Sequence, residues 1–220
     1  MHITYETVKQ SEEIRTYITQ ADASLLALGY TEHSFAHVTR CAVVAGDLLQ
    51  ELGYDAHTVE LCRIAAFMHD IGNVVNRNDH AQTGAVMAFR ILDNMGMEPE
   101  DVAAVITAIG HHDDATAFPV NAIAAALILA DKTDVRRSRV RNPDPASFDI
   151  HDRVNYAVTD QTLKINTEKK VISLNLQIDT DICSMYEYFE IFLQRMLMCR
   201  GAADMLGATF KLTANGAKVL

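Results

Sequence analysis

Apolar residues recur every three to four positions from Ser11 to about Arg141, which is the spacing of amphipathic helices. The clearest stripe ends at Gly53, a residue type that often terminates helices. Its members are Val38, Cys41, Ala42, Ala45, Leu48, Leu49 and Leu52. Four more helices are predicted from capping and proline signals: from about His57 to Ile71, from Asp79 to near Gly96, after Pro99 and after Pro119.

The pattern changes after Asn142-Pro-Asp-Pro145. Leu163–Ile165 and Ile172–Ile178 alternate apolar with polar residues around a polar turn, which predicts a β-hairpin. The alternation of Phe210 with Leu212 indicates one more strand. Between them a long amphipathic helix is predicted, with one stripe formed by Ile182, Met185, Tyr186, Phe189, Phe192, Leu193 and Met196.

Together these patterns predict a mainly α protein in two parts. Residues 1–142 form a helical domain, and residues 143–220 form a small α+β extension, hairpin plus long helix, packed on it. A two-stranded hairpin is marginal alone, so it must pack on the helices or on a partner chain. The stripe of the long helix fits either a homodimer contact or an internal core face.

Composition narrows the class of protein. Hydrophobic residues make up 49% of the chain, enough for a buried core, and the formal charge of −10 disfavours a protein that binds nucleic-acid polymers. The longest apolar run, Ala122–Ala130, is too short to span a bilayer. The four scattered cysteines and the Met1 segment favour a cytoplasmic protein with reduced thiols.

Histidines and aspartates lie at predicted helix ends and on inward faces. His33 and His37 share one helix face because they are four residues apart, and Asp131 ends an apolar run. A buried Asp131 needs a cation, either a nearby lysine or arginine or a metal with histidine ligands. Taken one at a time, each histidine could be an ordinary core residue, and Asp131 could be an ordinary ion-pair partner. As a set they favour a metal site, and imidazole with carboxylate suits Fe, Mn, Zn, Co or Ni.

The order of these residues resembles the H…HD…D signature of the HD superfamily of metal-dependent phosphohydrolases. The resemblance covers roughly His33 to Arg139 and is carried by His37-Val-Thr-Arg40, His69-Asp70-Ile-Gly72 and Asp131. It implies an HD-domain helical bundle in which His37, His69, Asp70 and Asp131 bind one metal.

Two further motifs are similar to the histidine-rich, two-metal branch of the superfamily. Asp79-His80-Ala-Gln-Thr-Gly84-Ala85 resembles its HxxxGA element, and His111-His112-Asp113 resembles its HHE element. The resemblance implies His80, His111 and His112 as ligands of a second metal, with Asp70 as the bridge, and places His33 where some HD-GYP proteins carry a ligand.

Within that branch the chain is similar to HD-GYP phosphodiesterases and to HD-type diadenosine tetraphosphate hydrolases. The GYP stretch is replaced by Asp114–Val120, and Asn73 stands where HD-GYP proteins have lysine. These differences disfavour cyclic di-GMP as the substrate. The expected cofactor is a pair of divalent metal ions, Fe or Mn before Zn, Ni, Co or Mg.

A basic run follows Asp131 and comprises Lys132, Arg136, Arg137, Arg139 and Arg141. Lys132, Arg136 and Arg139 would share a face if the helix continued, and arginine binds phosphate with two parallel hydrogen bonds. We expect these three residues and Asn73 to contact substrate, with Lys132 and Asp70 catalytic. The alternative for the run is a solvated helix end, where cations are favourable.

The sequence thus predicts hydrolysis of a phosphate ester or anhydride in a small nucleotide-like molecule, through a hydroxide that bridges two metals. Two alternatives stay open. Some HD-fold proteins with two irons use dioxygen, and the same ligands would serve an oxygenase. A metal-stabilised nucleotide sensor without catalysis is the third hypothesis.

Overall fold

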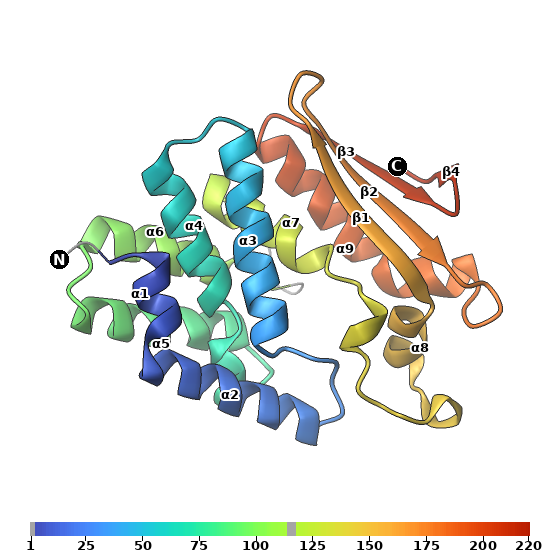
Figure 1. The fold of residues 1–220 in the computed structure, drawn as a ribbon, viewed down its shortest axis with the longest axis horizontal. Coiled ribbons are helices and arrows are strands. Elements are labelled where there is room, and N and C mark those ends of the chain that lie inside the picture. The colour runs from blue at the N-terminus through green and yellow to red at the C-terminus, as the bar shows by residue number, and fades with distance from the viewer. Residues whose placement is uncertain (1–2, 114–117) are drawn as a thin grey trace.

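Helices α1 to α7 occupy one end of the molecule, and a sheet backed by helix α9 occupies the other (Figure 1). The computed structural model describes residues 3–113 and 118–220. Most of the replaced GYP stretch, residues 114–117, lies outside the described part. The predicted mainly α fold with a C-terminal α+β elaboration is confirmed.

The helical part follows the expected order closely. Its elements are α1 (Tyr5–Gln10), α2 (Glu12–Ala27), α3 (Phe35–Glu51), α4 (Ala56–Met68), the 3-10 helix η1 (Ile71–Val74), α5 (His80–Asn94), α6 (Pro99–Gly110) and α7 (Ala122–Lys132). Local sequence fixes several starts: the side chains of Ser34, Asp55 and Asn121 each accept a backbone N–H of the helix they precede, and Pro99 opens α6.

One predicted helix differs in a way that matters for the site. The helix expected to run to Ile71 ends at Met68, and the chain turns at Asp70 into η1. His69 and Asp70 therefore lie just after the helix, where His69 Nε2 comes within 3.1 Å of Asp70 Oδ2. The apolar residues around them could not reveal this break, because they are buried in both elements.

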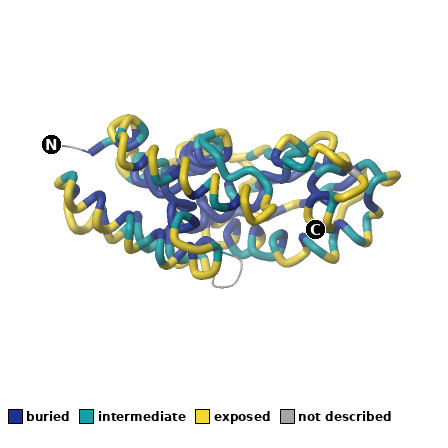
Figure 2. The backbone as a smooth tube through the Cα atoms, turned by 90° about the horizontal axis from the view of Figure 1, so that it is seen from below, coloured by how far each residue is buried: buried dark blue, intermediate teal, exposed yellow. Residues whose placement is uncertain are grey.

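Helix α7 lies at the centre of the helical part. Every residue from Ile123 to Ala130 is buried, and α7 packs against α3, α4 and α6. Figure 2 shows buried backbone through the interior of the molecule and exposed residues on its outside. Each fully buried large aliphatic side chain contributes roughly 1.5–3 kcal/mol to folding. This packing holds the end of α7, with Asp131, against the histidine-bearing helices.

The C-terminal part forms a four-stranded sheet in the order β1-β2-β3-β4. Its elements are η2 (Arg137–Arg139), η3 (Pro145–Ser147), α8 (Ile150–Tyr156), β1 (Val158–Asn166), β2 (Val171–Ile178), α9 (Met185–Met205), β3 (Thr209–Ala214) and β4 (Ala217–Lys218). The predicted hairpin is β1–β2, antiparallel with Leu163 opposite Leu174. β3 adds parallel to β2, with α9 as the crossover, and pairs Leu174 with Leu212.

Helix α9 connects the two parts, since it packs against both β3 and α7. Its predicted apolar stripe is partly wrong. Tyr186 is 75% exposed and Leu193 is 43% exposed, whereas Tyr188 and Cys199 are buried. The stripe is shifted because the helix contacts elements on two sides. The domain boundary at residue 142 stays a prediction, as does a homodimer. Among the described residues no helix is long and apolar enough to cross a membrane.

Two glycines let η1 lie directly against the first turns of α5. A Cβ on Gly72 would lie 2.0 Å from the carbonyl oxygen of His80 and 2.5 Å from the amide nitrogen of Gly84. No side chain fits this gap, and the opposing atoms are backbone. The contact places Asp70, at the start of η1, next to His80, the first residue of α5.

We predict that Gly72→Ala destabilises the protein, because backbone atoms must move apart. A loss of about 2 kcal/mol or more would lower the melting temperature by roughly 4–8 °C in a chain of this size. Gly201→Ala is the matched control, since nothing lies within 4 Å of its Cβ position in α9. Alanine favours a helix interior, so this variant should melt at the same or a higher temperature. Equal melting temperatures for both variants in a calorimetric scan would contradict the close contact.

Candidate metal centre

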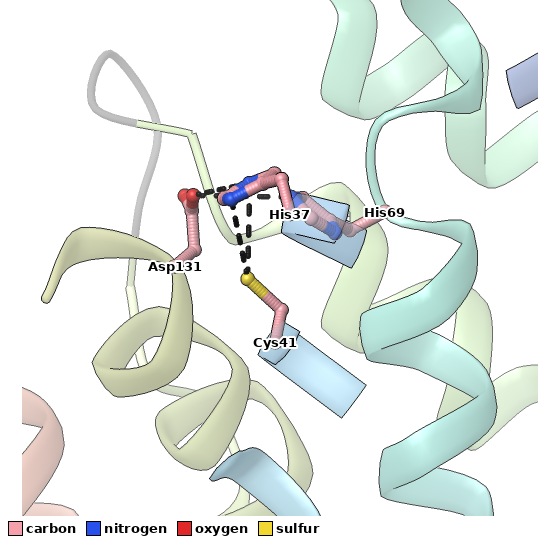
Figure 3. A group of neighbouring side chains, drawn as sticks. All are labelled: His37, Cys41, His69 and Asp131. Carbon is pink, nitrogen blue, oxygen red and sulfur yellow. Dashed lines mark hydrogen bonds and ion pairs between the residues drawn. The ribbon is translucent and has the colours of Figure 1, made fainter. Parts of the chain in front are cut away.

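Side chains from five separate segments converge where α3, α4 and α7 meet the start of α5. His37 lies in α3, His69 and Asp70 follow α4, His80 opens α5, and Asp131 lies one residue before the end of α7. His112 follows α6. Figure 3 shows His37 of α3, His69 just after α4 and Asp131 of α7 directed toward one another. These three residues lie far apart in the sequence, so only the fold brings them together.

The first group of ligand atoms surrounds His37 and His69. His37 Nε2 lies 3.3 Å from Asp131 Oδ1 and 3.6 Å from Asp70 Oδ2. His69 Nε2 lies 3.1 Å from Asp70 Oδ2 and 3.8 Å from Asp131 Oδ1. Two imidazole nitrogens and two carboxylate oxygens thus face a common point, which is the set that the resemblance implied for one metal.

The pairing of His69 with Asp70 shows that this point requires a cation. Both His69 Nε2 and Asp70 Oδ2 are buried, and neither makes a hydrogen bond. His69 Nδ1 bonds the carbonyl oxygen of Ala66 at 2.7 Å, so a neutral ring presents a lone pair at Nε2. Two acceptors 3.1 Å apart repel unless a proton or a metal ion lies between them. The residues present therefore fit a metal ion.

The pKa shifts of His69 and Asp70 also fit positive charge at this point. Burial acts to lower the pKa of His69, but the charges of Asp70 and Asp131 outweigh it and raise that pKa. Burial acts to raise the pKa of Asp70, yet His69, His33 and His80 hold it well below its usual range. The pocket thus keeps its carboxylate ionised and favours positive charge beside it.

Backbone carbonyls orient most of the imidazoles. Nδ1 of His33, His69, His80 and His112 lies 2.6–3.0 Å from the carbonyl oxygens of Thr31, Ala66, Arg77 and Ile109, respectively. An N–H donated there fixes the tautomer and leaves Nε2 as the ligand atom. Each of these bonds joins residues two or three positions apart, so the local backbone conformation orients each ring.

A second group of ligand atoms lies on the other side of Asp70. His80 Nε2 is 3.5 Å from Asp70 Oδ1 and 3.8 Å from Asp113 Oδ1. The ring of His112 packs edge-on against His69 and His80, with centroids 4.9 and 5.1 Å away. Burial lowers the pKa of His112 well below its usual value, which keeps the ring neutral. The two oxygens of Asp70 thus face different histidine groups, as a bridging carboxylate requires.

The two remaining histidines of the predicted ligand set lie differently. His33 packs its ring against His37 with a centroid distance of 5.6 Å and lines the same cavity. His111 is half-buried, bonds the carbonyl oxygen of Thr107 at 2.9 Å, and is absent from the described lining of the cavity. The structure therefore brings His112, rather than His111, into the cluster. A ligand role for His111 or His33 stays a prediction.

Asp134 is a site residue that the sequence analysis missed. Its Oδ2 accepts a hydrogen bond from His37 Nδ1 at 2.8 Å, so it orients the one imidazole that no backbone carbonyl holds. Burial acts to raise the pKa of Asp134, but hydrogen bonds from Arg136 and His37 keep it well below its usual range. Its spacing of three residues from Asp131 was the available signal, because Asp131 lies in the last turn of the buried helix α7 and Asp134 comes directly after that helix.

Cys41 lies in the same cluster, with its Sγ within 4.8 Å of candidate ligand atoms of His37, His69 and Asp131. Its Sγ is 3.7 Å from both ring nitrogens of His37, one helical turn before it (Figure 3). A sulfur equidistant from Nδ1 and Nε2 packs against the ring instead of extending along the Nε2 lone pair. Burial raises the pKa of this thiol well above its usual value, which disfavours a thiolate.

The basic run after Asp131 does not form one helix face, which corrects the expectation for Lys132, Arg136 and Arg139. Helix α7 ends at Lys132, and the chain continues as a loop into η2. Arg136 pairs with Asp134 at 2.5 Å, and Arg137 packs over the ring of Tyr156. Arg141 pairs with Asp22. Of this run, Lys132 and Arg139 line the cavity.

Lys132 and Asn73 hold the two key carboxylates. Lys132 Nζ lies 2.6 Å from Asp131 Oδ2, on the side away from His37. Asn73 Nδ2 donates to Asp70 Oδ1 at 2.9 Å. Asn73 is 2% exposed and is absent from the described cavity lining, so it positions Asp70 rather than facing a ligand.

A cavity of about 340 Å³ opens beside the cluster. Asp70, His80, His112 and Asp131 form one end. Several lining residues were not predicted from the sequence, and they are Tyr30, Thr31, Arg77, Asp149, His151, Asp152, Asn155 and Arg195. Most come from α8, α9 and the loop after α2, whose approach to the metal ligands depends on tertiary packing.

Comparisons with known proteins agree with this geometry. An uncharacterized protein of Methanocaldococcus jannaschii is 24% identical, with 76% of this chain and 73% of that protein covered. Ribonuclease Y of Cutibacterium acnes is 37% identical over 39% of this chain, and ribonuclease Y of Thermobifida fusca is 31% identical over 62% of it. The chain spans 15% and 26% of these two ribonucleases.

The match to a family is more direct than the match to any one relative. Residues 34–137 match the family model described as HD domain. This segment contains His37, His69, Asp70, His80, His112, Asp131 and Asp134. The predicted resemblance to the HD superfamily of metal-dependent phosphohydrolases is therefore confirmed for this segment.

Proposed function

We propose that this protein hydrolyses a phosphate ester or anhydride of a small nucleotide-like molecule with two divalent metal ions. The observation that carries the proposal is the placement of Asp70. Its Oδ2 faces His69 and His37, whereas its Oδ1 faces His80, and the whole group lies at the end of a cavity. A binding protein that only needed structural support would not require ligand atoms exposed to a cavity.

The residues divide into two sets around Asp70. His37, His69 and Asp131 would hold one ion with Asp70 Oδ2, and His80 and His112 would hold the other with Asp70 Oδ1. Nitrogen and carboxylate ligands without thiolate favour Fe or Mn, with Zn, Co, Ni or Mg as alternatives. Bound there, the metals would acidify a water molecule and polarise the phosphate.

Cations at the rim of the cluster would receive the phosphate oxygens. Lys132 is 6% exposed and lines the cavity beside Asp131, and Arg77 lines it beside His80. Arg139 lines it as well, with its guanidinium held by the carbonyl oxygens of Glu32 and Asp134. These fixed donors would orient a phosphate and stabilise the charge that develops during its transfer.

The ribonucleases Y are named for a polymeric substrate, and we propose a small one for this chain. Its formal charge is −10, and the cavity wall opposite the metal ligands contains the acidic residues Asp149 and Asp152. A long phosphate backbone would be repelled by both.

Removing the bridging carboxylate should abolish both metal binding and activity. We predict that Asp70→Ala retains less than one metal ion per chain, and that hydrolysis of p-nitrophenyl phosphate or its bis-ester falls by more than about 100-fold, the upper range for outer-shell partners. Asp47→Ala is the control, since this carboxylate of α3 is 51% exposed and pairs with Arg63. Metal is measured by elemental analysis and activity with Mn under anaerobic conditions, and full anaerobic activity of Asp70→Ala would refute the proposal.

The contact between Asp134 and His37 generates a second prediction. Asp134→Asn should weaken metal binding by about 10–100-fold, because the ring of His37 loses its charged hydrogen-bond partner. Asp47→Asn makes the same change of charge on α3 and should leave the affinity unchanged. The affinities are measured by competition with a chelator, and equal values for the two variants would show that Asp134 has no role at the site.

A third variant tests whether Cys41 only packs against His37 or also binds the metal. Cys41→Ala should keep the wild-type metal content, because its Sγ packs against the ring of His37 and burial keeps the thiol protonated. His37→Ala should lose metal in the same preparation. A loss of metal from Cys41→Ala would assign the thiol as a ligand instead.

A further inference from the structure

The cavity continues beyond the metal ligands to a wall made by the C-terminal part of the chain. Helix α8 and its N-cap contribute Asp149, His151, Asp152 and Asn155, and α9 contributes Arg195. All five lie outside residues 34–137, the segment that matches the HD family. This wall is therefore a feature of this chain and not of the shared domain.

Three side chains of the wall each use one polar atom in a hydrogen bond to the protein. Asn155 Nδ2 donates to the carbonyl oxygen of His151 at 2.8 Å. Asp149 Oδ1 accepts the backbone N–H of Asp152 at 2.7 Å, and Asp152 Oδ2 accepts from Asn142 at 3.4 Å. These bonds hold the side chains in place before any ligand arrives, which reduces the entropy lost on binding.

The bonds just described do not involve one further side-chain oxygen of each residue. These atoms are Asn155 Oδ1, Asp149 Oδ2 and Asp152 Oδ1. Asn155 is 7% exposed and Asp152 is 8% exposed, and both line the cavity. Amide and carboxylate oxygens accept hydrogen bonds, so a ligand in the cavity that carries hydrogen-bond donors would match this wall.

The wall also offers donors. The exposed imidazole of His151 and the hydroxyl of Thr31 line the same space as the three acceptors. Hydroxyl groups both donate and accept hydrogen bonds, whereas an ammonium group only donates. Positive charge at Arg139 and Arg195 further disfavours a cationic ligand.

We propose that this wall, the α8 face, is the subsite for a hydroxyl-bearing, sugar-like part of the substrate. Its phosphate would lie at the metal end, which rests on the proposed function. The cavity of about 340 Å³ is large enough for such a molecule, since small-ligand pockets span about 300–1,000 Å³. Asn155 and His151 determine specificity in this arrangement, and the metal ligands do not.

The test compares two ligands that cannot be hydrolysed, methylphosphonate and the phosphonate analogue of ribose 5-phosphate. Titration calorimetry on the metal-loaded full chain should show the ribosyl compound binding at least tenfold more tightly. Asn155→Leu should reduce this gain to less than threefold and leave the methylphosphonate affinity unchanged. His151→Ala, at an exposed position where folding is not at risk, should reduce the gain at least threefold. Asn94→Leu, at the exposed end of α5, is the control and should keep it.

Equal affinities of the two ligands for the wild-type protein would overturn the subsite. So would a gain that persists in Asn155→Leu or in His151→Ala, or a loss of both affinities by the same factor. Turnover of p-nitrophenyl phosphate separates this inference from the proposed function. Binding of the ribosyl compound without any turnover would contradict hydrolysis alone, whereas turnover without ribosyl preference would contradict the α8 face alone.

Discussion

Negative charge buried among hydrogen-bond acceptors is the constraint around which this fold is arranged. Asp70 and Asp131 place carboxylate oxygens within 4 Å of histidine nitrogens whose other ring nitrogens are already bonded. Such a group is unstable in a protein interior unless a cation neutralises it. Lys132 compensates the far side of Asp131, but no described side chain provides a cation between His69 and Asp70. The fit of this group to a metal ion is therefore a property of the folded interior.

Close packing makes that arrangement possible. Helix α7 is apolar up to Ala130 and carries Asp131 at its end, so burying the helix delivers the carboxylate to the site. Gly72 and Gly84 let η1 and α5 meet backbone to backbone, which sets the distance between Asp70 and His80. The energy of the apolar core thus compensates for the unfavourable burial of charge.

The C-terminal part completes the site instead of merely covering the bundle. Helix α9 packs on α7, and α8 packs on η2, directly after the last site residues of the HD segment. This contact places a polar wall opposite the metal ligands. The α8 face thus lies outside the segment that matches the HD domain, although it lines the same cavity as the candidate metal ligands.

The sequence by itself determined the helical class, the hairpin and the resemblance to the HD domain. Helix periodicity, caps at Ser34 and Asn121, and the alternation in β2 are local properties that act in the same way in any context. Other features depend on how the elements pack and appear only in the tertiary structure. They are the break between Met68 and Ile71, the position of His112 rather than His111 in the cluster, the hydrogen bond from His37 to Asp134, and the placement of α8 beside the cavity. Each depends on which surface of an element meets another element. Periodicity cannot encode that choice, since the competing arrangements bury equally apolar residues and differ only in how whole elements pack.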